Sequence, residues 1–146
     1  MAKGEGLNAD MISRLIDRAI EEMSYAYTPY SGFRVGAALL TESGEIYTGC
    51  NIENAAYTPT NCAERTAFFK AVSEGERHFA AICIVGGKDG KLADYTSPCG
   101  VCRQVMMEFC DPEQFKIILA ISREEYQIYT LKELLPEGFG PARLAR

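Results

Sequence analysis

The chain has 146 residues, a length typical of a single domain and sufficient to bury a hydrophobic core without disulfides. Hydrophobic residues make up 47% and charged residues 24%, which is ordinary globular composition, and no apolar run approaches the ~18 residues that a membrane span needs. The net charge of −5 argues against a nucleic-acid partner, because Lys and Arg contacts to phosphates supply most of that affinity, so we expect one domain over residues 1–146 that binds a small, uncharged molecule.

The N-terminal part of the chain predicts a cytoplasmic protein that begins with a helix. Residues 1–6 contain no apolar segment of the kind found in secretory signals. We therefore expect the six cysteines to stay reduced, since disulfides are rare in the cytosol. Residues 9–25 place apolar side chains at helical spacing, with Asn8 or Asp10 available as the cap, and so predict an amphipathic helix that packs on a sheet.

A β-hairpin is predicted next. Residues 33–40 alternate well enough for a strand, residues 42–44 read as a turn, and residues 46–51 as the returning strand. Residues 53–61 then predict an irregular loop that leads to Cys62.

The middle of the chain predicts a helix and a buried strand. Residues 62–72 have apolar side chains at helical spacing and predict a buried helix, with Gly75 placed to end it. Residues 79–85 form a short apolar and β-branched run, typical of a strand buried on both faces, which Gly86 and Gly87 are expected to close.

The remaining elements complete an alternating pattern. Residues 100–109 predict a helix, residues 116–121 and 126–130 two strands, and residues 131–135 a last helix. The order α-β-β-α-β-α-β-β-α predicts a sheet between layers of helices, parallel where a helix crosses over and antiparallel at the first hairpin.

Two short motifs carry the chemistry, and each lies where a loop passes into a predicted helix: TNCAER at residues 60–65 and SPCGVCR at residues 97–103. Cys99 and Cys102 are three residues apart, so both sulfurs project from one face of a helix's first turn. A right-handed crossover would bring the helix that follows Cys62 to the same edge of the sheet. Three thiolates suffice to hold Zn²⁺ and leave its fourth tetrahedral position for water, as in a catalytic site.

The motifs also allow simpler readings. A closed structural zinc would need a fourth ligand, and no second pair of closely spaced ligands is available to supply it. The single residues that could serve instead are Cys50, Cys83, Cys110 and His78.

Two side chains beside Cys62 have a simple and a chemical interpretation. Glu64 would be placed to exchange protons with a water at the metal, or would only favour the helix dipole. Arg65 would either be an exposed helix arginine or donate hydrogen bonds to a coordinating sulfur, offsetting the negative charge of three thiolates.

With these motifs in place, the sequence resembles the short, single-domain branch of the cytidine deaminase family along nearly its whole length. A metal ligand followed by x-Glu, and later by P-C-x-x-C, is the signature of zinc-dependent base deaminases. Residues 30–39, 49–57 and 135–141 also resemble segments of that family, in the same order. The resemblance implies an α/β fold, a three-layer α/β/α sandwich with a mixed five-stranded sheet. It further implies a homotetramer with one zinc ion per subunit, and hydrolysis of cytidine and deoxycytidine to uridine and deoxyuridine.

The same resemblance assigns roles to individual residues. The zinc ligands would be Cys62, Cys99 and Cys102, with Glu64 moving protons. Asn51 and Glu53 correspond to the pair that hydrogen-bonds the ribose hydroxyls, and Phe33 to the ring that packs on the pyrimidine. The residues expected to reach a site across subunit boundaries are Ala55, Tyr57 and Phe139. From the position of Ala63 at a helix start, we expect its backbone N–H to bind the pyrimidine O2.

Two other functions stay open at this point. One is deamination of a different cytosine-containing compound, as in blasticidin-type enzymes, and the Asn51 and Glu53 pair together with Phe139 argues against it. The other is a catalytically inactive zinc-binding subunit that serves only in assembly, which the presence of Glu64 disfavours.

Overall fold

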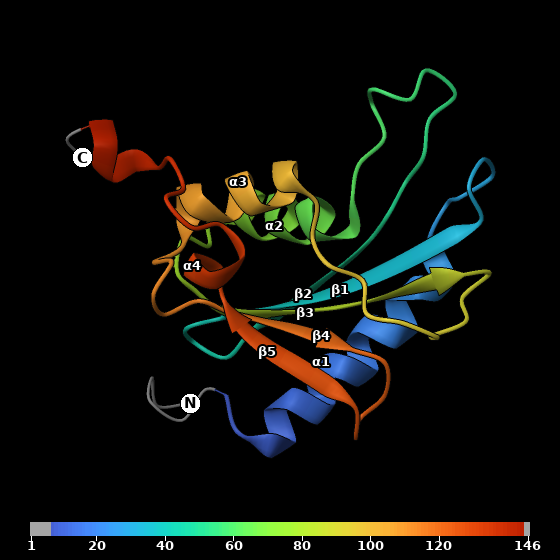
Figure 1. Ribbon diagram of the computed structural model, residues 1–146, viewed down its shortest axis with the longest axis horizontal. Helices are drawn as coiled ribbons and strands as arrows, with labels where there is room; N and C mark the ends of the chain where they lie inside the picture. Colours follow the sequence, from blue (N-terminus) through green and yellow to red (C-terminus); the bar gives the residue numbers. More distant parts are fainter. Residues whose placement is uncertain (1–6, 145–146) are drawn as a thin grey trace.

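A five-stranded sheet with the strand order β2-β1-β3-β4-β5 forms the middle of the computed structural model, which describes residues 7–144 (Figure 1). The expectation that residues 1–6 carry no signal lies outside the described residues. The strands are β1 (Phe33–Thr41), β2 (Ile46–Cys50), β3 (Phe79–Lys88), β4 (Lys116–Ala120) and β5 (Tyr126–Thr130).

The sheet is mixed, as the order of elements predicted. Strand β1 is antiparallel to both of its neighbours, β2 and β3, while β3 is parallel to β4, and β4 is antiparallel to β5. Strands β2 and β3 therefore run in the same direction with β1 between them. The helix α2 (Ala63–Ser73) connects these two strands, and α3 (Gly100–Phe109) connects the parallel neighbours β3 and β4.

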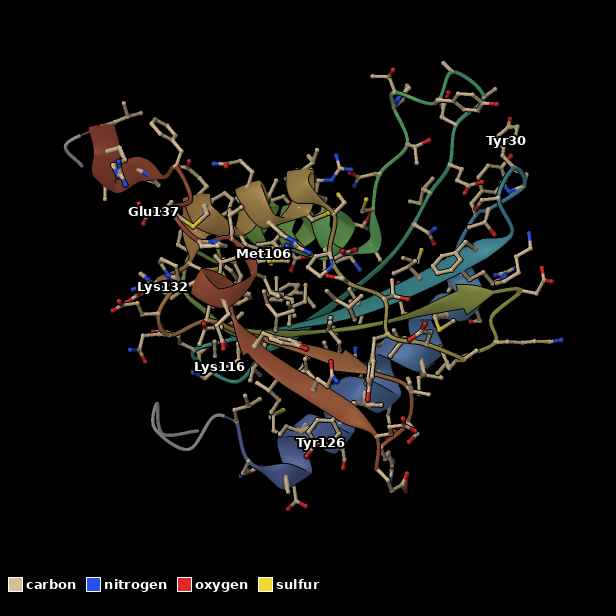
Figure 2. All side chains as sticks on the ribbon, viewed as in Figure 1. Tyr30, Met106, Lys116, Tyr126, Lys132 and Glu137 are labelled. Atoms are coloured by element: carbon tan, nitrogen blue, oxygen red, sulfur yellow. The ribbon has the colours of Figure 1, made fainter. Side chains whose placement is uncertain are left out.

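Helices cover both faces of the sheet (Figure 1). Asn8 caps α1 (Ala9–Glu22) by accepting the N–H of Met11 at 2.9 Å, and the helix packs its apolar stripe on one face. The last residues of the predicted helix instead form a 3₁₀ turn, η2 (Met23–Tyr25). The other face is covered by α2, α3 and the short α4 (Leu131–Leu134), and Met106 of α3 points toward the sheet (Figure 2). The predicted three-layer arrangement is confirmed.

Strand β3 is longer than predicted. It continues through Gly86 and Gly87 to Lys88 because its last residues pair with the first residues of β1, a contact between distant parts of the chain. The two glycines mark a close approach of the following loop, since a Cβ on Gly87 would lie 1.7 Å from the carbonyl oxygen of Lys91. The prediction that these glycines end the strand was therefore wrong.

The prediction that α2 is a buried helix holds for one face only. Phe68 lies in the core, with its ring centroid 5.0 Å from that of Phe79, whereas Phe69 is 48% exposed. Lys70 is also exposed and donates a hydrogen bond to the carbonyl of Thr48 on the edge strand β2. Among the described residues 7–144, no helix has both the length and the apolar character to traverse a bilayer.

Candidate active site and metal centre

The helices α2 and α3 lie side by side on the sheet, and each begins at a cysteine (Figure 1). Cys62 is the N-cap residue of α2, and Cys99 is the N-cap residue of α3. The Sγ of Cys99 accepts the backbone N–H of Cys102, at 3.4 Å, in the first turn of α3. Unpaired N–H groups and the helix dipole at such termini favour thiolates over thiols.

The three sulfurs form a cluster that fits a zinc ion. Their Sγ atoms all lie within 4.8 Å of one another, and those of Cys62 and Cys99 are 3.7 Å apart. Tetrahedral coordination with Zn–S bonds of about 2.3 Å separates two sulfurs by about 3.8 Å, so this spacing suits the metal. The candidates for a fourth protein ligand, Cys50, Cys83, Cys110 and His78, are not members of the cluster. The donor set is therefore that of an open, catalytic site.

Hydrogen bonds within the cluster promote ionisation of Cys62. The bond with Cys102 contributes most, followed by those from Arg65 and Cys99, and together they lower the pKa of Cys62 to about 5. Cys102 shares its proton with Cys62 and is itself buried, so its pKa is raised. Arg65 donates from Nη2 to the Sγ of Cys62 at 3.3 Å, as a charge-offsetting arginine would. A bound dication would favour the thiolate form of all three cysteines.

Glu64 lies in the first turn of α2 and is only 4% exposed. Burial is the main cause that raises the pKa of its carboxyl group to about 7, with the negative charge of Cys62 adding to the shift and Arg65 opposing it. A nearby metal ion would pull this pKa down again. A carboxyl group poised between its two forms can accept a proton in one step and return it in the next.

Glu53 is held by the turn that precedes β1. Its Oε1 accepts the backbone N–H groups of Tyr30 and Ser31, at 3.0 and 3.1 Å, and its Oε2 accepts the hydroxyl of Ser31. These bonds, the hydroxyl first, lower the pKa of Glu53, so it is a carboxylate at neutral pH. No sequence motif indicated these partners, which lie more than 20 positions away along the chain.

Asn51 fixes the start of β1. Its Oδ1 accepts the N–H of Val35 at 2.9 Å, and its Nδ2 donates to the carbonyl of Phe33 at 2.8 Å. The ring of Phe33 is 40% exposed and lines a cavity of about 510 Å³, together with the end of β3, Lys91 and residues 93–96. Asn51 thus keeps one amide hydrogen for a ligand and anchors the backbone of the aromatic residue.

Arg103 is a residue whose role the sequence motifs did not reveal. Its guanidinium donates to the carbonyls of Pro98 and Leu134, at 2.7 and 2.5 Å, and to the hydroxyl of Ser97 at 2.8 Å. It therefore ties the loop that carries Cys99 to α4. The only feature of the sequence that could have pointed to this role of Arg103 is its position directly after Cys102.

The remaining predicted site residues lie on segments that project from the body. Figure 1 shows the loop between β2 and α2, which carries Ala55 and Tyr57, and the C-terminal segment, which carries Phe139, rising at opposite ends of the molecule. Tyr57 is 72% exposed, with its ring centroid 6.2 Å from that of Tyr30, near the tip of the turn before β1 (Figure 2). The ring of Phe139 is exposed, and its carbonyl accepts a hydrogen bond from Gln104. One chain therefore does not bring these segments together.

Known proteins share both the sequence and the fold. Residues 10–118 match the family model described as cytidine and deoxycytidylate deaminase zinc-binding region. The chain is 48% identical over 134 residues to a cytidine deaminase of Sporosarcina psychrophila, covering 92% of this chain and 95% of that protein. It is 50% identical over 125 residues to a cytidine deaminase of Halalkalibacterium halodurans, and the match covers 86% of this chain and 91% of that protein.

Solved structures agree with these sequence matches. The crystal structure of a cytidine deaminase from Burkholderia pseudomallei superposes with a TM-score of 0.78 at 43% identity, covering 86% of this chain and 97% of that one. For a cytidine deaminase from Mycobacterium tuberculosis the TM-score is 0.74 at 37% identity, covering 87% and 95%.

Proposed function

This chain belongs to the cytidine and deoxycytidylate deaminase family, and from that premise we propose that it hydrolyses cytidine and deoxycytidine to uridine and deoxyuridine with release of ammonia. The observation that carries the proposal is the cluster of Cys62, Cys99 and Cys102 beside the buried carboxyl group of Glu64. Deamination of cytosine needs an activated water and a group that relays its proton, and these residues would supply both.

The sulfurs of Cys62, Cys99 and Cys102 would hold one zinc ion in each subunit. When bound, zinc supplies Lewis-acid activation of water at neutral pH. Glu64 takes the proton of the attacking water as a general base and delivers it to N3 of the pyrimidine, while the oxygen attacks C4. Glu64 then takes the proton of the new hydroxyl group on C4 and gives it to the amino group, so that the C4–N bond breaks, ammonia departs and C4 keeps a carbonyl oxygen. Its burial excludes bulk water from this exchange.

The nucleoside would be held by groups around this centre. The N–H of Ala63, at the first turn of α2 and without a partner inside the helix, donates to O2 of the pyrimidine. Phe33 packs against the ring. The ribose hydroxyls donate to the carboxylate of Glu53 and accept from the free amide hydrogen of Asn51, whose remaining groups are already held by the protein.

The assembly proposed for this site is a homotetramer. Exposed aromatic side chains on the β2–α2 loop and on the C-terminal segment support it, because Tyr57 and Phe139 are large apolar groups that a partner subunit would cover. Ala55, on the same loop, would reach the neighbouring site with them. The whole chain, residues 1–146, would act as one domain, since the described residues share a single sheet. A cytoplasmic location suits a site that depends on three reduced thiols.

The test is the ultraviolet absorbance of cytidine, deoxycytidine and cytosine, each incubated separately with the purified protein. We expect both nucleosides to be deaminated and free cytosine to react far more slowly, because it lacks the ribose that Glu53 and Asn51 would bind. Removal of zinc with a chelator should abolish the reaction, and added zinc should restore it. Equal rates on cytosine and cytidine would contradict the ribose assignment, and no reaction with either nucleoside would contradict the function.

A further inference from the structure

The turn formed by residues 29–32 orients two of the proposed substrate contacts at once. Three of its groups, the N–H of Tyr30 and the N–H and hydroxyl of Ser31, donate to the carboxylate of Glu53. The Oγ of Ser31 also accepts the N–H of Phe33 at 3.0 Å. An ionised carboxylate has about four acceptor positions, so the turn leaves roughly one free for a substrate hydroxyl. Any shift of this turn would move the carboxylate and the aromatic residue together.

The turn is held from outside by the end of β3. The ammonium group of Lys88 donates to the carbonyl of Ser31 at 2.5 Å, and the N–H of Asp89 donates to the carbonyl of Gly32 at 2.7 Å. Lys88 lies opposite Phe33 in the pairing of β3 with β1, so its side chain starts from a rigid position. Hydrogen bonds from a charged donor are roughly twice as strong as neutral ones, so we expect the bond from Lys88 to the carbonyl of Ser31 to stabilise the turn.

The packing around Gly32 shows how closely the ammonium group of Lys88 approaches the backbone of the turn. Gly32 has a φ of +67°, a conformation that glycine adopts without strain, and a Cβ at this position would lie 2.9 Å from Nζ of Lys88. The ammonium thus lies directly against the turn. The hydroxyl of Ser31 and the backbone N–H groups of the turn contribute most to the lowered pKa of Glu53, and the positive charge of Lys88 adds to that shift.

We infer that Lys88 is a positioning residue for nucleoside binding, which holds the carbonyl of Ser31 and thereby keeps Glu53 and Phe33 in their binding geometry. The inference rests on the proposed function, because it takes these two residues as substrate contacts. Lys88 belongs to β3 and acts through the turn, whereas proton transfer depends on Glu64 in α2. Its loss should therefore weaken substrate binding and leave the chemical step unchanged.

The test compares Lys88→Met with the wild-type enzyme in its assembled, zinc-loaded form, with cytidine as substrate. A hydrogen bond to a charged group contributes enough that we expect KM to rise about 10-fold. The value of kcat should stay within about twofold, and this also shows that the variant is folded. Lys88→Arg should restore most of the loss in KM, because its guanidinium can donate to the same carbonyl.

Lys116→Met is the matched control. Lys116 begins β4 and pairs with Ala81 near the start of β3, it does not line the cavity of Phe33, and among the described residues 7–144 its ammonium group makes no hydrogen bond or ion pair. This variant removes the same charge without touching the turn, so an unchanged KM would separate the specific contact from a general charge effect. A rise in KM equal to that of Lys88→Met would overturn the inference.

A double-mutant cycle identifies the route of the effect. If Lys88 acts through the turn and Glu53, then Lys88→Met in a Glu53→Gln background should raise KM by less than about threefold, since the positioned carboxylate is already lost. A full 10-fold rise in that background would overturn the inference, as would an unchanged KM in Lys88→Met alone. In either case wild-type turnover of cytidine would leave the proposed function intact.

Discussion

At the scale of single residues, Glu64 and Arg65 are neighbours in sequence with different surroundings. The carboxyl group of Glu64 is buried against the cysteine cluster, and desolvation keeps it easy to protonate. The guanidinium of Arg65 reaches back along α2 to a ligand sulfur, while its Nε is buried and has no hydrogen-bond partner among the described residues. One side chain therefore suits proton exchange, and the other suits charge balance around the metal.

Glu64→Gln tests the proton relay. Glutamine matches the size of glutamate but cannot take up a proton, and each positioned proton transfer contributes about 10²–10⁴ in rate. Since Glu64 serves in two steps, we expect kcat to fall by at least that factor, with one zinc per chain retained. Turnover is measured by the absorbance of cytidine and zinc by metal analysis of the same sample. Near-normal turnover in a zinc-loaded variant would refute the assignment.

Arg65→Gln tests the charge balance. The substitution removes the donor to the Sγ of Cys62, 3.3 Å away, and leaves the three thiolates with less compensation. Outer hydrogen-bond partners of metal ligands commonly contribute 10- to 100-fold, so we expect kcat to fall by about 10-fold while zinc is still bound. Arg65→Lys should recover part of the lost kcat, because lysine keeps the positive charge but lacks the planar guanidinium group and its fixed hydrogen-bond donors. A kcat equal to that of the wild type would show that Arg65 has no part in the site.

Sequence reasoning located the metal ligands because their spacing depends on local helix geometry. Cys99 and Cys102 share the first turn of one helix, and Cys62 begins another. The same reasoning could not find Lys88 or Ser31, because their contact joins positions 57 residues apart. Such contacts depend on the register of β1 with β3, which a single sequence does not specify.

At the scale of secondary-structure elements, glycines determine how closely the layers approach. A Cβ on Gly36 of β1 would lie 2.0 Å from the carbonyl oxygen of Ala19 in α1, and one on Gly49 of β2 would lie 2.4 Å from that of Ala63 in α2. Helix backbones on both faces thus rest directly on the sheet. The start of α2, and with it Cys62, is placed by the second of these contacts.

The same close packing explains which element boundaries were predictable. The predicted bounds of α3 and β5 agree with the structure, because local periodicity and capping define them. The end of β3 was not predictable, since it depends on pairing with β1 and on the loop that passes over Gly86 and Gly87. Glycine in a sequence is ambiguous, because it is found both at the ends of strands and at positions where another segment of backbone packs closely against a strand.

Gly36→Ala tests the contact between α1 and β1. The added methyl group would overlap the backbone of α1, which cannot yield as a flexible side chain would. Overpacking of this kind costs about 2 kcal/mol or more, so we expect Tm to fall by roughly 4–8 °C at equal protein concentration. Gly100→Ala is the control, because a Cβ there meets nothing within 4 Å. Equal Tm values for the two variants would contradict this account of the packing.

At the scale of the whole molecule, the three layers were predictable from the order of elements, whereas the assembly stays a prediction. Alternating helices and buried strands leave few arrangements that cover both faces of a sheet. Oligomeric contacts have no such local pattern. In one chain they are visible only as exposed apolar side chains, among them Tyr57, Phe69 and Phe139, which hydrophobic periodicity alone does not separate from core residues.

Phe139 offers the most direct test of a shared site. If its ring completes the pocket of a neighbouring subunit, Phe139→Ala should raise KM for cytidine about 10-fold or more with a smaller change in kcat, because a buried ring of this size contributes about 1.5–3 kcal/mol. The backbone of the segment should stay in place, since it is the carbonyl of Phe139 that Gln104 holds. Light scattering of the variant would verify that the assembly is intact.

Mixed assemblies then decide whose pocket the ring completes. Phe139→Ala chains have low affinity and Glu64→Gln chains have no proton relay, so neither homo-oligomer should be efficient at low cytidine concentration. In a mixture refolded or co-expressed together, a site with an intact Glu64 from the first chain receives an intact ring from the second. Such sites should show the wild-type KM, and activity at low substrate should exceed the sum of the separate variants. If Phe139 acted only within its own chain, mixing would give no gain, and an active monomer would exclude a shared site altogether.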